Sequence, residues 1–417
     1  MGTRKRGIGL ICAVLCVLIV VAALAACGSS GTSNSTSSGA PGVTKTLNIG
    51  VLMPFSGDGA LWGKTELASI QVAAADLNAA GGVKVGNDTY MFGVKAYDNQ
   101  WDPSVSATVA RKAVSDGVRY VFSWSGPEVL AENAATRGTT VLTFVTASDA
   151  ICQGPKHPNN YNSWFYYPDN LQVLYSYAKK AHPDYTTVVP IITDDAVSLQ
   201  EAKYLKQYVT PIGFKVLDPV KIAGGETDFY PVLTPLIKEG VNIIDVASPG
   251  PEDAALIIKQ AHELGYKGIF AHADAPDVHD YASIAGWPAM EGFIGAPVYQ
   301  TLPTATGKHW RVAYMKKTQG DKSTGPTADY DTMLLIAAAM KKAGSVDPDV
   351  VNKALPTVTV EGTTGLTRFG GADVLGIPHL LERPITVIQV NDGKVATVYS
   401  GWPARVAGSM ASPTPTQ

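Results

Sequence analysis

Three glycines near the start of the chain have a spacing that could form a phosphate-binding turn. Gly57, Gly59 and Gly63 lie in the stretch PFSGDGALWG, between an apolar run and an amphipathic one. A strand, a glycine-rich loop and a helix in this order can hold a pyrophosphate at the helix N-terminus. Dinucleotide binding is therefore the first chemistry that these residues suggest.

The spacing around these glycines excludes both nucleotide motifs. The pattern G-x-G-x-x-x-G is one residue longer than the dinucleotide fingerprint. Asp98, the acid that ends the second predicted strand, lies 41 residues after Gly57, too far along to be the ribose-binding acid expected about 20 residues on. The residues GKT at 63–65 resemble the end of a P-loop, but Asp58 stands where that motif requires a glycine.

A second candidate chemistry is metal binding in the segment AHADAPDVHD. Its titratable residues are His272, Asp274, Asp277, His279 and Asp280. At a strand end, positions 272 and 274 point to the same face, as two ligands of a hard or borderline metal would. The alternative is an exposed polar loop with one acid facing a ligand. Because the body has no G-x-S-x-G or H-E-x-x-H motif, a metallo-hydrolase using His272, Asp274 and His279 is a disfavoured alternative.

The elements that position these residues alternate between strand-like and helix-like segments from about residue 46 to residue 295. Such alternation predicts an α/β fold with parallel sheets covered by helices on both faces. Two runs of about four strands predict two doubly wound lobes, and Asp392-Gly393 predicts the turn of a C-terminal hairpin. Ligands of open parallel sheets bind beyond the carboxyl ends of the strands. The loops at those ends are 54–62, 123–129, 146–152, 193–199, 247–252 and 272–278.

The first 26 residues have the composition of a targeting segment. Three basic residues at 4–6 precede an apolar run, and LAAC at 24–27 resembles a bacterial lipobox that would lipidate Cys27. The Gly/Ser/Thr-rich stretch after it predicts a flexible tether up to residue 45. A permanent membrane-spanning helix is the alternative, since about 20 apolar residues suffice. Both interpretations place the body outside the cytoplasmic membrane.

The charge and the cysteines exclude further classes. Without the first 26 residues the formal net charge changes from −3 to about −6, so nucleic acid is not an expected partner. With Cys27 assigned to lipid, Cys152 is the one cysteine left in the body. A lone cysteine is typical of a small buried hydrophobe rather than of a nucleophile.

Three stretches together resemble a known family. They are IGVLMPFSGDGALWGKTELASIQVAAADLNAAGGV, KAYDNQWDPSVSATVARKAVSDGVRYVFSWSG and GGETDFYPVLTPLIKEGVNIIDVASPGPEDAALIIKQAHELGYKGIF. Their order and spacing are similar to those of type I periplasmic binding proteins, in particular the leucine-binding-protein-like receptors of ABC transporters. The resemblance covers roughly residues 46–402 and implies a solute receptor without catalytic activity or cofactor.

The resemblance also implies a division of the chain. Three crossovers are expected near 164–168, 292–297 and 381–387. The N-terminal lobe would comprise 46–165 and 296–383, and the C-terminal lobe 166–295 and 384–403. Residues 1–26 would be the signal peptide, 27–45 the lipidated cysteine and tether, and 404–417 a disordered tail.

Site residues are implied by the same resemblance, residue by residue. The ligand carboxylate would be held by Ser125, Gly126, Pro127, Thr146, Ala147 and Ser148, in loops whose free N–H groups suit an anion. Each of these could instead be a simple helix cap. Ser56 and Trp62 would face the ligand from the first loop, and Trp124 would add an apolar face. Asp274 falls where related receptors bind the α-amine of an amino acid.

Two departures from the family pattern leave the ligand open. Val197 and Gly250 stand where the amino-acid receptors carry tyrosines, so leucine specificity does not transfer. An amino acid, a larger amine or amide, and an aromatic acid all remain candidates. The expected partners are the permease and ATPase of an ABC importer, and a ligand sensor for a signalling partner is the alternative.

Overall fold

The computed structural model describes residues 42–57, 59–146, 150–297, 302–320 and 327–407. The predicted leader, Cys27, most of the predicted tether, Ala147, Ser148 and the end of the predicted tail lie outside the described residues. Within the described ranges, no helix has the length and apolarity needed to cross a membrane.

The first sheet has nine strands, most of them parallel. Its order is β13 (Thr359–Glu361), β14 (Leu366–Gly370), β15 (Leu380–Glu382), β6 (Asn160–Asn162), β5 (Leu142–Val145), β4 (Tyr120–Ser123), β1 (Thr44–Met53), β3 (Asp88–Asp98) and β2 (Val83–Val85). The strands from β15 to β3 pair in parallel, whereas β2, β13 and β14 pair antiparallel. The helices of this lobe are α1 (Ala60–Ala79), α2 (Pro103–Ser115), α3 (Gly126–Ala135), α9 (Ala305–Lys317), α10 (Thr327–Ala343), α11 (Pro348–Ala354) and α12 (Ala372–Leu375).

The second sheet has eight strands and the same plan. Its order is β17 (Lys394–Gly401), β16 (Ile385–Asn391), β12 (Ile294–Gly295), β11 (Ile269–His272), β10 (Ile243–Asp245), β7 (Thr187–Thr193) and β8 (Lys215–Val216), with β9 (Val220–Ile222) also paired to β7. Its helices are α4 (Tyr167–Ala181), α5 (Ala196–Val209), α6 (Tyr230–Lys238), α7 (Pro251–Glu263) and α8 (Val278–Ala285), and the short α13 (Ala404–Ala407) comes after β17. The predicted hairpin is present, with positive φ at Asp392 and Gly393.

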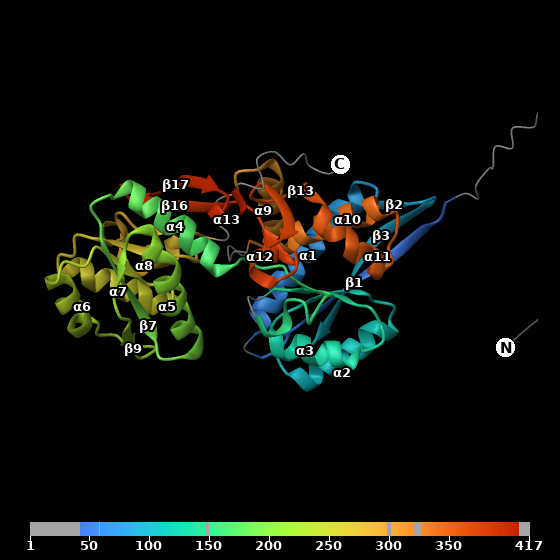
Figure 1. The fold of residues 1–417 in the computed structure, drawn as a ribbon, viewed down its shortest axis with the longest axis horizontal. Coiled ribbons are helices and arrows are strands. Elements are labelled where there is room, and N and C mark those ends of the chain that lie inside the picture. Colours follow the sequence, from blue (N-terminus) through green and yellow to red (C-terminus); the bar gives the residue numbers. More distant parts are fainter. Residues whose placement is uncertain (1–41, 58, 147–149, 298–301, 321–326, 408–417) are drawn as a thin grey trace, which may run out of the picture. The chain divides into compact units, whose positions relative to one another are not determined.

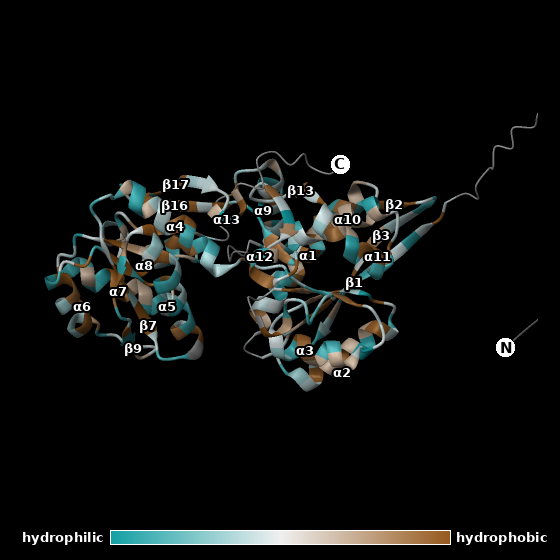
Figure 2. Cartoon of the chain, viewed as in Figure 1, coloured by the Kyte–Doolittle hydropathy of each residue, from teal (hydrophilic) through white to brown (hydrophobic). Residues whose placement is uncertain are grey.

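The strand sequences explain the layered architecture. The second half of β1 is buried on both faces, including Ile49, Val51 and Met53, as a central parallel strand must be. Each lobe has its own hydrophobic core, around β1 and α10 in the first and on both faces of β10 in the second. Figure 2 shows teal and brown residues interleaved on the covering helices, as amphipathic helices require.

The chain passes between the two sheets three times. The passages lie between β6 and α4, after β12, and at residues 383–384 between β15 and β16. Figure 1 shows the result: blue, teal and orange segments build the first lobe, whereas green and yellow segments with the red strands β16 and β17 build the second. The two predicted α/β lobes are therefore confirmed, and the residue boundaries between them stay a prediction.

Candidate functional site

The glycines of the first loop serve close packing. A Cβ on Gly63 would lie 1.9 Å from the carbonyl oxygen of Pro54, and one on Gly59 would lie 2.7 Å from Cγ of Pro54. Gly57 has a φ of 68°, which glycine adopts without the usual cost. The glycines thus let α1 start tightly against the end of β1, which directs the first turn of α1 to the carboxyl edge of the sheet.

Three tryptophans meet at that edge. Trp62 and Trp124 stack with ring centroids 5.7 Å apart and planes inclined by 18°. Trp101 meets both edge-on, at centroid distances of 5.7 Å and 6.4 Å. They come after β1, β3 and β4, which are neighbours in the sheet, so strand order brings them together. Trp62 and Trp101 are exposed, and Trp124 is half-buried.

Trp101 was not among the predicted site residues, and hydrogen bonds within the loop after β3 hold it in place. Gln100 and Trp101 both have left-handed backbones, with φ of 55° and 56°, a conformation that costs of order 1–3 kcal/mol each outside glycine. The buried Asn99 accepts a hydrogen bond from the Trp101 N–H at 3.1 Å.

Asp98 accepts from the N–H groups of Gln100 and Phe55 at 3.0 and 2.9 Å. Although burial opposes ionisation, hydrogen bonds from Phe55, Ser56 and Gln100 lower the pKa of Asp98. The predicted ligand contact Ser56 is exposed and interacts with this carboxylate.

The predicted carboxylate-binding segment 125–127 forms the start of α3. Ser125 is the N-cap residue, but its hydroxyl donates a hydrogen bond to the carboxylate of Glu128 in the first turn. Gly126 is buried, and Pro127 is exposed and carries no N–H group to offer a ligand. Glu128 is 3% exposed, so a negative side chain already occupies this helix end.

Thr146 is fully buried at the end of β5. Its N–H and its hydroxyl both donate to the carbonyl oxygen of Ser123, at 3.0 and 3.3 Å, which ties the ends of β4 and β5 together. Ala147 and Ser148 lie outside the described residues. A ligand contact of these three residues stays a prediction.

In the second lobe, Asp274 lies just beyond the end of β11. His272 Nε2 lies 3.0 Å from Asp274 Oδ1, and the other ring nitrogen of His272 lies 2.8 Å from the Tyr281 hydroxyl. Asn170 donates to the carbonyl oxygen of Ala273 at 2.8 Å and so fixes the backbone beside Asp274. The Asp274 side chain is 30% exposed, which leaves it accessible at the carboxyl edge of this sheet.

Two further carboxyl groups, which the sequence interpretation missed, lie near Asp274. Asp245 ends β10 and accepts a hydrogen bond from the Tyr175 hydroxyl at 2.6 Å. Glu201, in α5, accepts one from Ser248 at 2.7 Å. Burial raises the pKa of Asp245 to about 6, and burial together with the charge of Asp274 raises the pKa of Glu201 to about 7. The three acids come after or at the ends of β7, β10 and β11, which are neighbours in the second sheet, so strand order brings them to one edge. The corresponding edge of the first sheet carries the three tryptophans.

Val197 and Gly250 leave open space at the same edge. Val197, in the first turn of α5, is 68% exposed, and its N–H donates to the N-cap residue Asp195 at 2.9 Å. Gly250 is the exposed N-cap residue of α7, and a Cβ built on it meets nothing within 4 Å. The space that tyrosines fill in the related receptors, according to the resemblance, is thus open here.

The histidines of the 271–280 segment do not converge on a metal site. His279 is exposed and its Nδ1 lies 2.7 Å from Asp277 in the same helix start, whereas His272 is buried. Across the described ranges, no three His, Cys, Asp or Glu side chains are grouped as metal ligands. Cys152 is buried, as the sequence predicted.

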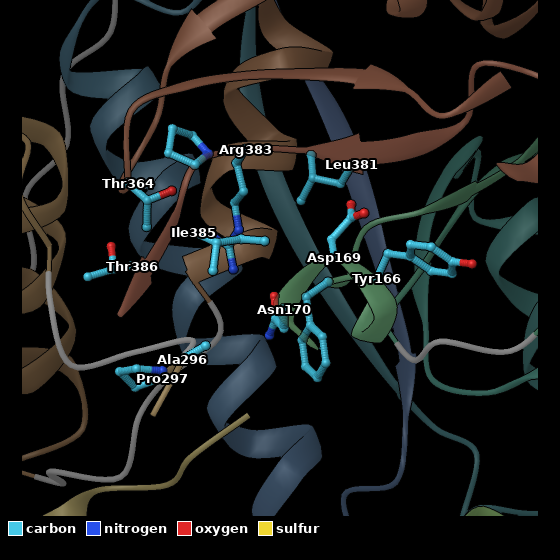
Figure 3. A pocket seen from close by; sticks show the side chains of 12 residues that line it. Tyr166, Asp169, Asn170, Ala296, Pro297, Thr364, Leu381, Arg383, Ile385 and Thr386 are labelled. Carbon is cyan, nitrogen blue, oxygen red and sulfur yellow. The ribbon is translucent and has the colours of Figure 1, made fainter. Parts of the chain in front are cut away.

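A small cavity of about 40 Å³ lies at the crossovers. Figure 3 shows Asp169 and Asn170 of α4 and Arg383 of the last crossover around it. Beside it, Arg405 of α13 makes a bidentate pair with Asp169 at 2.6 and 2.8 Å and reaches Glu382 of β15 at 2.7 Å. Residues 404–407, which the sequence interpretation assigned to a disordered tail, are therefore helical and joined to the body.

The comparisons with known proteins agree with this architecture. Residues 46–394 match the family model described as periplasmic binding protein. The chain belongs to this family. A solved periplasmic binding protein of the same fold, the Leu/Ile/Val/Thr/Ala-binding protein of Brucella ovis in its closed conformation, superposes with a TM-score of 0.71 at 20% identity, covering 89% of this chain and 98% of that one. The family resemblance and the fold inferred from sequence are thus confirmed.

Curated relatives of this periplasmic binding protein are named for amino acids. The leucine-, isoleucine-, valine-, threonine- and alanine-binding protein of Pseudomonas aeruginosa is 28% identical over 337 residues, 78% of this chain and 86% of that protein. A solute-binding protein of R. palustris, solved in complex with benzoate, has the same fold with a TM-score of 0.63 at 16% identity, covering 86% of this chain and 97% of that one.

Proposed function

We propose that this protein is an extracytoplasmic solute-binding lipoprotein of an ABC importer, which binds an amino acid or a related small polar solute between its two lobes. The observation that supports this most is that both sheets carry grouped side chains suited to a ligand at their carboxyl edges. The carboxyl edge of the first sheet carries Trp62 and Trp124, and the same edge of the second carries Asp274. Ligands of doubly wound sheets bind at such edges. The amino-acid-binding relatives support the solute class.

Closure of the lobes on the solute is the second part of the proposal. Three crossovers joining two separately packed cores form a natural hinge. The ligand shifts the protein toward the closed state only as far as it binds that state better. The permease of the importer would then recognise the closed, loaded form, and the ATPase would drive transport.

Anchoring rests on the sequence of the leader. LAAC at 24–27 supports lipidation of Cys27, and two or more acyl chains would hold the protein stably at the outer face of the membrane. Metabolic labelling with a radioactive or clickable fatty acid should mark the wild-type chain and leave Cys27→Ala unlabelled. Labelling that persists in Cys27→Ala would contradict this assignment.

A thermal-shift screen over amino acids, amines, amides and aromatic acids tests the receptor function. At least one class should raise the unfolding temperature in a concentration-dependent way, because a ligand that binds the folded state alone stabilises it. If no small solute does so, the receptor function is wrong. The alternative function, a ligand sensor for a signalling partner, uses the same binding site. Neighbouring permease and ATPase genes would favour transport, whereas a neighbouring kinase gene would favour sensing.

A further inference from the structure

The first lobe presents large apolar side chains to solvent at its ligand edge. Leu61 is 61% exposed, Trp62 48%, Trp101 43% and Ile151 55%. They come after β1, β3 and β5, and the half-buried Trp124 comes after β4 between them. The three tryptophans contact one another, and exposed apolar surface grouped in this way marks a binding site, where each Å² removed from water contributes about 25 cal/mol. The solute must therefore bring an apolar body to this surface.

The second lobe gathers three carboxyl groups at its ligand edge, those of Glu201, Asp245 and Asp274. Glu201 accepts a hydrogen bond from the neutral hydroxyl of Ser248. Asp245 accepts one from the neutral hydroxyl of Tyr175 and one from a backbone N–H group. Asp274 has a histidine beside it and remains 30% exposed. Burial opposes the ionised forms of Glu201 and Asp245, so a positively charged ligand group beside them would stabilise their carboxylates and be bound more tightly.

The position that would take a ligand carboxylate is already negative. Glu128 lies buried in the first turn of α3 and accepts the Ser125 hydroxyl. It thereby uses the positive end of the helix dipole that an anion would otherwise use. Pro127 removes one of the N–H donors. A ligand carboxylate placed here would face a like charge.

From these three features we infer that the solute is an organic cation with an apolar or aromatic body, and that binding does not require a carboxylate group. The inference rests on the proposed receptor function and specifies its ligand. The apolar body lies on the tryptophans, which are also the strongest partners for a cation above a ring. The amine lies against Asp274, near Glu201 and Asp245. Val197 and Gly250 leave room for a body larger than a branched aliphatic side chain.

Two matched series of solutes test the inference on the detergent-purified full chain. One is phenylalanine, phenethylamine and 3-phenylpropionate; the other is leucine, isopentylamine and 4-methylpentanoate. Each amine should raise the unfolding temperature at least as much as its amino acid, and each acid should leave it unchanged. Asp274→Asn should weaken amine binding roughly tenfold or more, because a charge-assisted contact is lost. Asp280→Asn, on the exposed side of α8, is the matched control.

The outcomes separate this inference from the receptor function. Stabilisation by the acids, or by the amino acids but not the amines, would overturn the cation inference and leave the receptor function standing. A shift from another class of solute with none from these six would do the same. If no solute in either screen raises the unfolding temperature, both the cation inference and the receptor function are wrong.

Discussion

The rings of Trp62 and Trp124 stack with centroids 5.7 Å apart, although Trp62 lies in the first turn of α1 and Trp124 lies just beyond β4. The contact exists because β1 and β4 are parallel neighbours, so the loops after these two strands emerge at one edge of the sheet. Trp101 closes the cluster from the other side, after β3. Most of this aromatic surface is not needed for the core, since Trp62 and Trp101 remain exposed.

Replacing Trp101 with leucine should weaken solute binding and leave stability nearly unchanged. The residue is 43% exposed, and an aromatic pair is worth about 0.5–1.5 kcal/mol, so roughly a three- to tenfold loss of affinity is expected. Calorimetric titration measures the affinity and thermal unfolding measures the stability. Tyr399→Leu, an exposed aromatic residue in β17, is the control and should bind normally. Equal affinities for Trp101→Leu and wild type would contradict a binding role for the cluster.

Affinity for an amine should rise with pH through neutrality. Burial and the charge of Asp274 raise the pKa of Glu201 to about 7, so part of the negative charge at this edge appears only above that pH. Asp245, whose buried carboxyl has a pKa of about 6, ionises over an overlapping pH range, and the ring of His272 lies 3.0 Å from Asp274 at the same edge. A bound cation favours the ionised carboxylates, so binding releases protons below pH 7. Titrations from pH 5.5 to 8.5 should show tighter binding at the alkaline end, and Glu201→Gln should flatten the curve. A curve that falls with pH would exclude this role for Glu201.

The stability of the first lobe should fall as the pH rises. Glu66 and Asp329 are buried against each other between α1 and α10, and burial raises the pKa of both carboxyl groups. Because the folded state holds these two protons more tightly than the unfolded state does, their contribution to the free energy of unfolding is complete below the ordinary carboxyl pKa of about 4. That contribution is lost as the pH rises through the raised pKa values. We expect Glu66→Gln to reduce this loss by up to about 1.4 kcal/mol per pH unit. Denaturant unfolding at pH 5, 7 and 9 measures it, and identical slopes for variant and wild type would show that the pair does not titrate.

Arg405 should contribute strongly to stability. It pairs with the buried Asp169 and Glu382, and although burial opposes its charge, these carboxylates raise its pKa. Arg405→Gln leaves the buried Asp169 without its cation, for which a loss of about 3–5 kcal/mol is typical, whereas Glu382 keeps its pair with Arg368 at 2.9 Å. Arg137→Gln, an exposed arginine, should change the free energy of unfolding by less than about 0.5 kcal/mol. Chemical denaturation of both variants gives the comparison, and similar small losses in both would show that the Arg405 pairs are not stabilising.

Much of the fold was predictable because hydrophobic periodicity is local. The alternating strands and helices from β1 to β12 and the Asp392-Gly393 hairpin are all indicated by short windows of sequence. The three crossovers came only from family resemblance. Strands β13, β14 and β15 at one side of the first sheet and the attachment of Arg405 depend on partners far away in the chain, so no local pattern indicated them.

The candidate site was predictable only in part. Asp274 and two of the tryptophans lie just beyond predicted strands, and the same reasoning could have found Trp101, which also lies beyond a strand. That β3, β1 and β4 are neighbours was not visible in sequence, and it is the strand order that groups the three rings. Glu201 lies in the second turn of a helix, and Glu128 appeared to be an ordinary residue of a helix start; their positions became clear from burial and contacts.

The most direct test of the receptor function is a titration that interrogates both lobes with one solute. The solute giving the largest thermal shift would be titrated calorimetrically into wild type, Trp124→Leu and Asp274→Asn. We predict one saturable site per chain in the wild type and weaker binding in both variants, one from each lobe. Saturable binding that neither substitution changes would contradict a site shared by the two lobes.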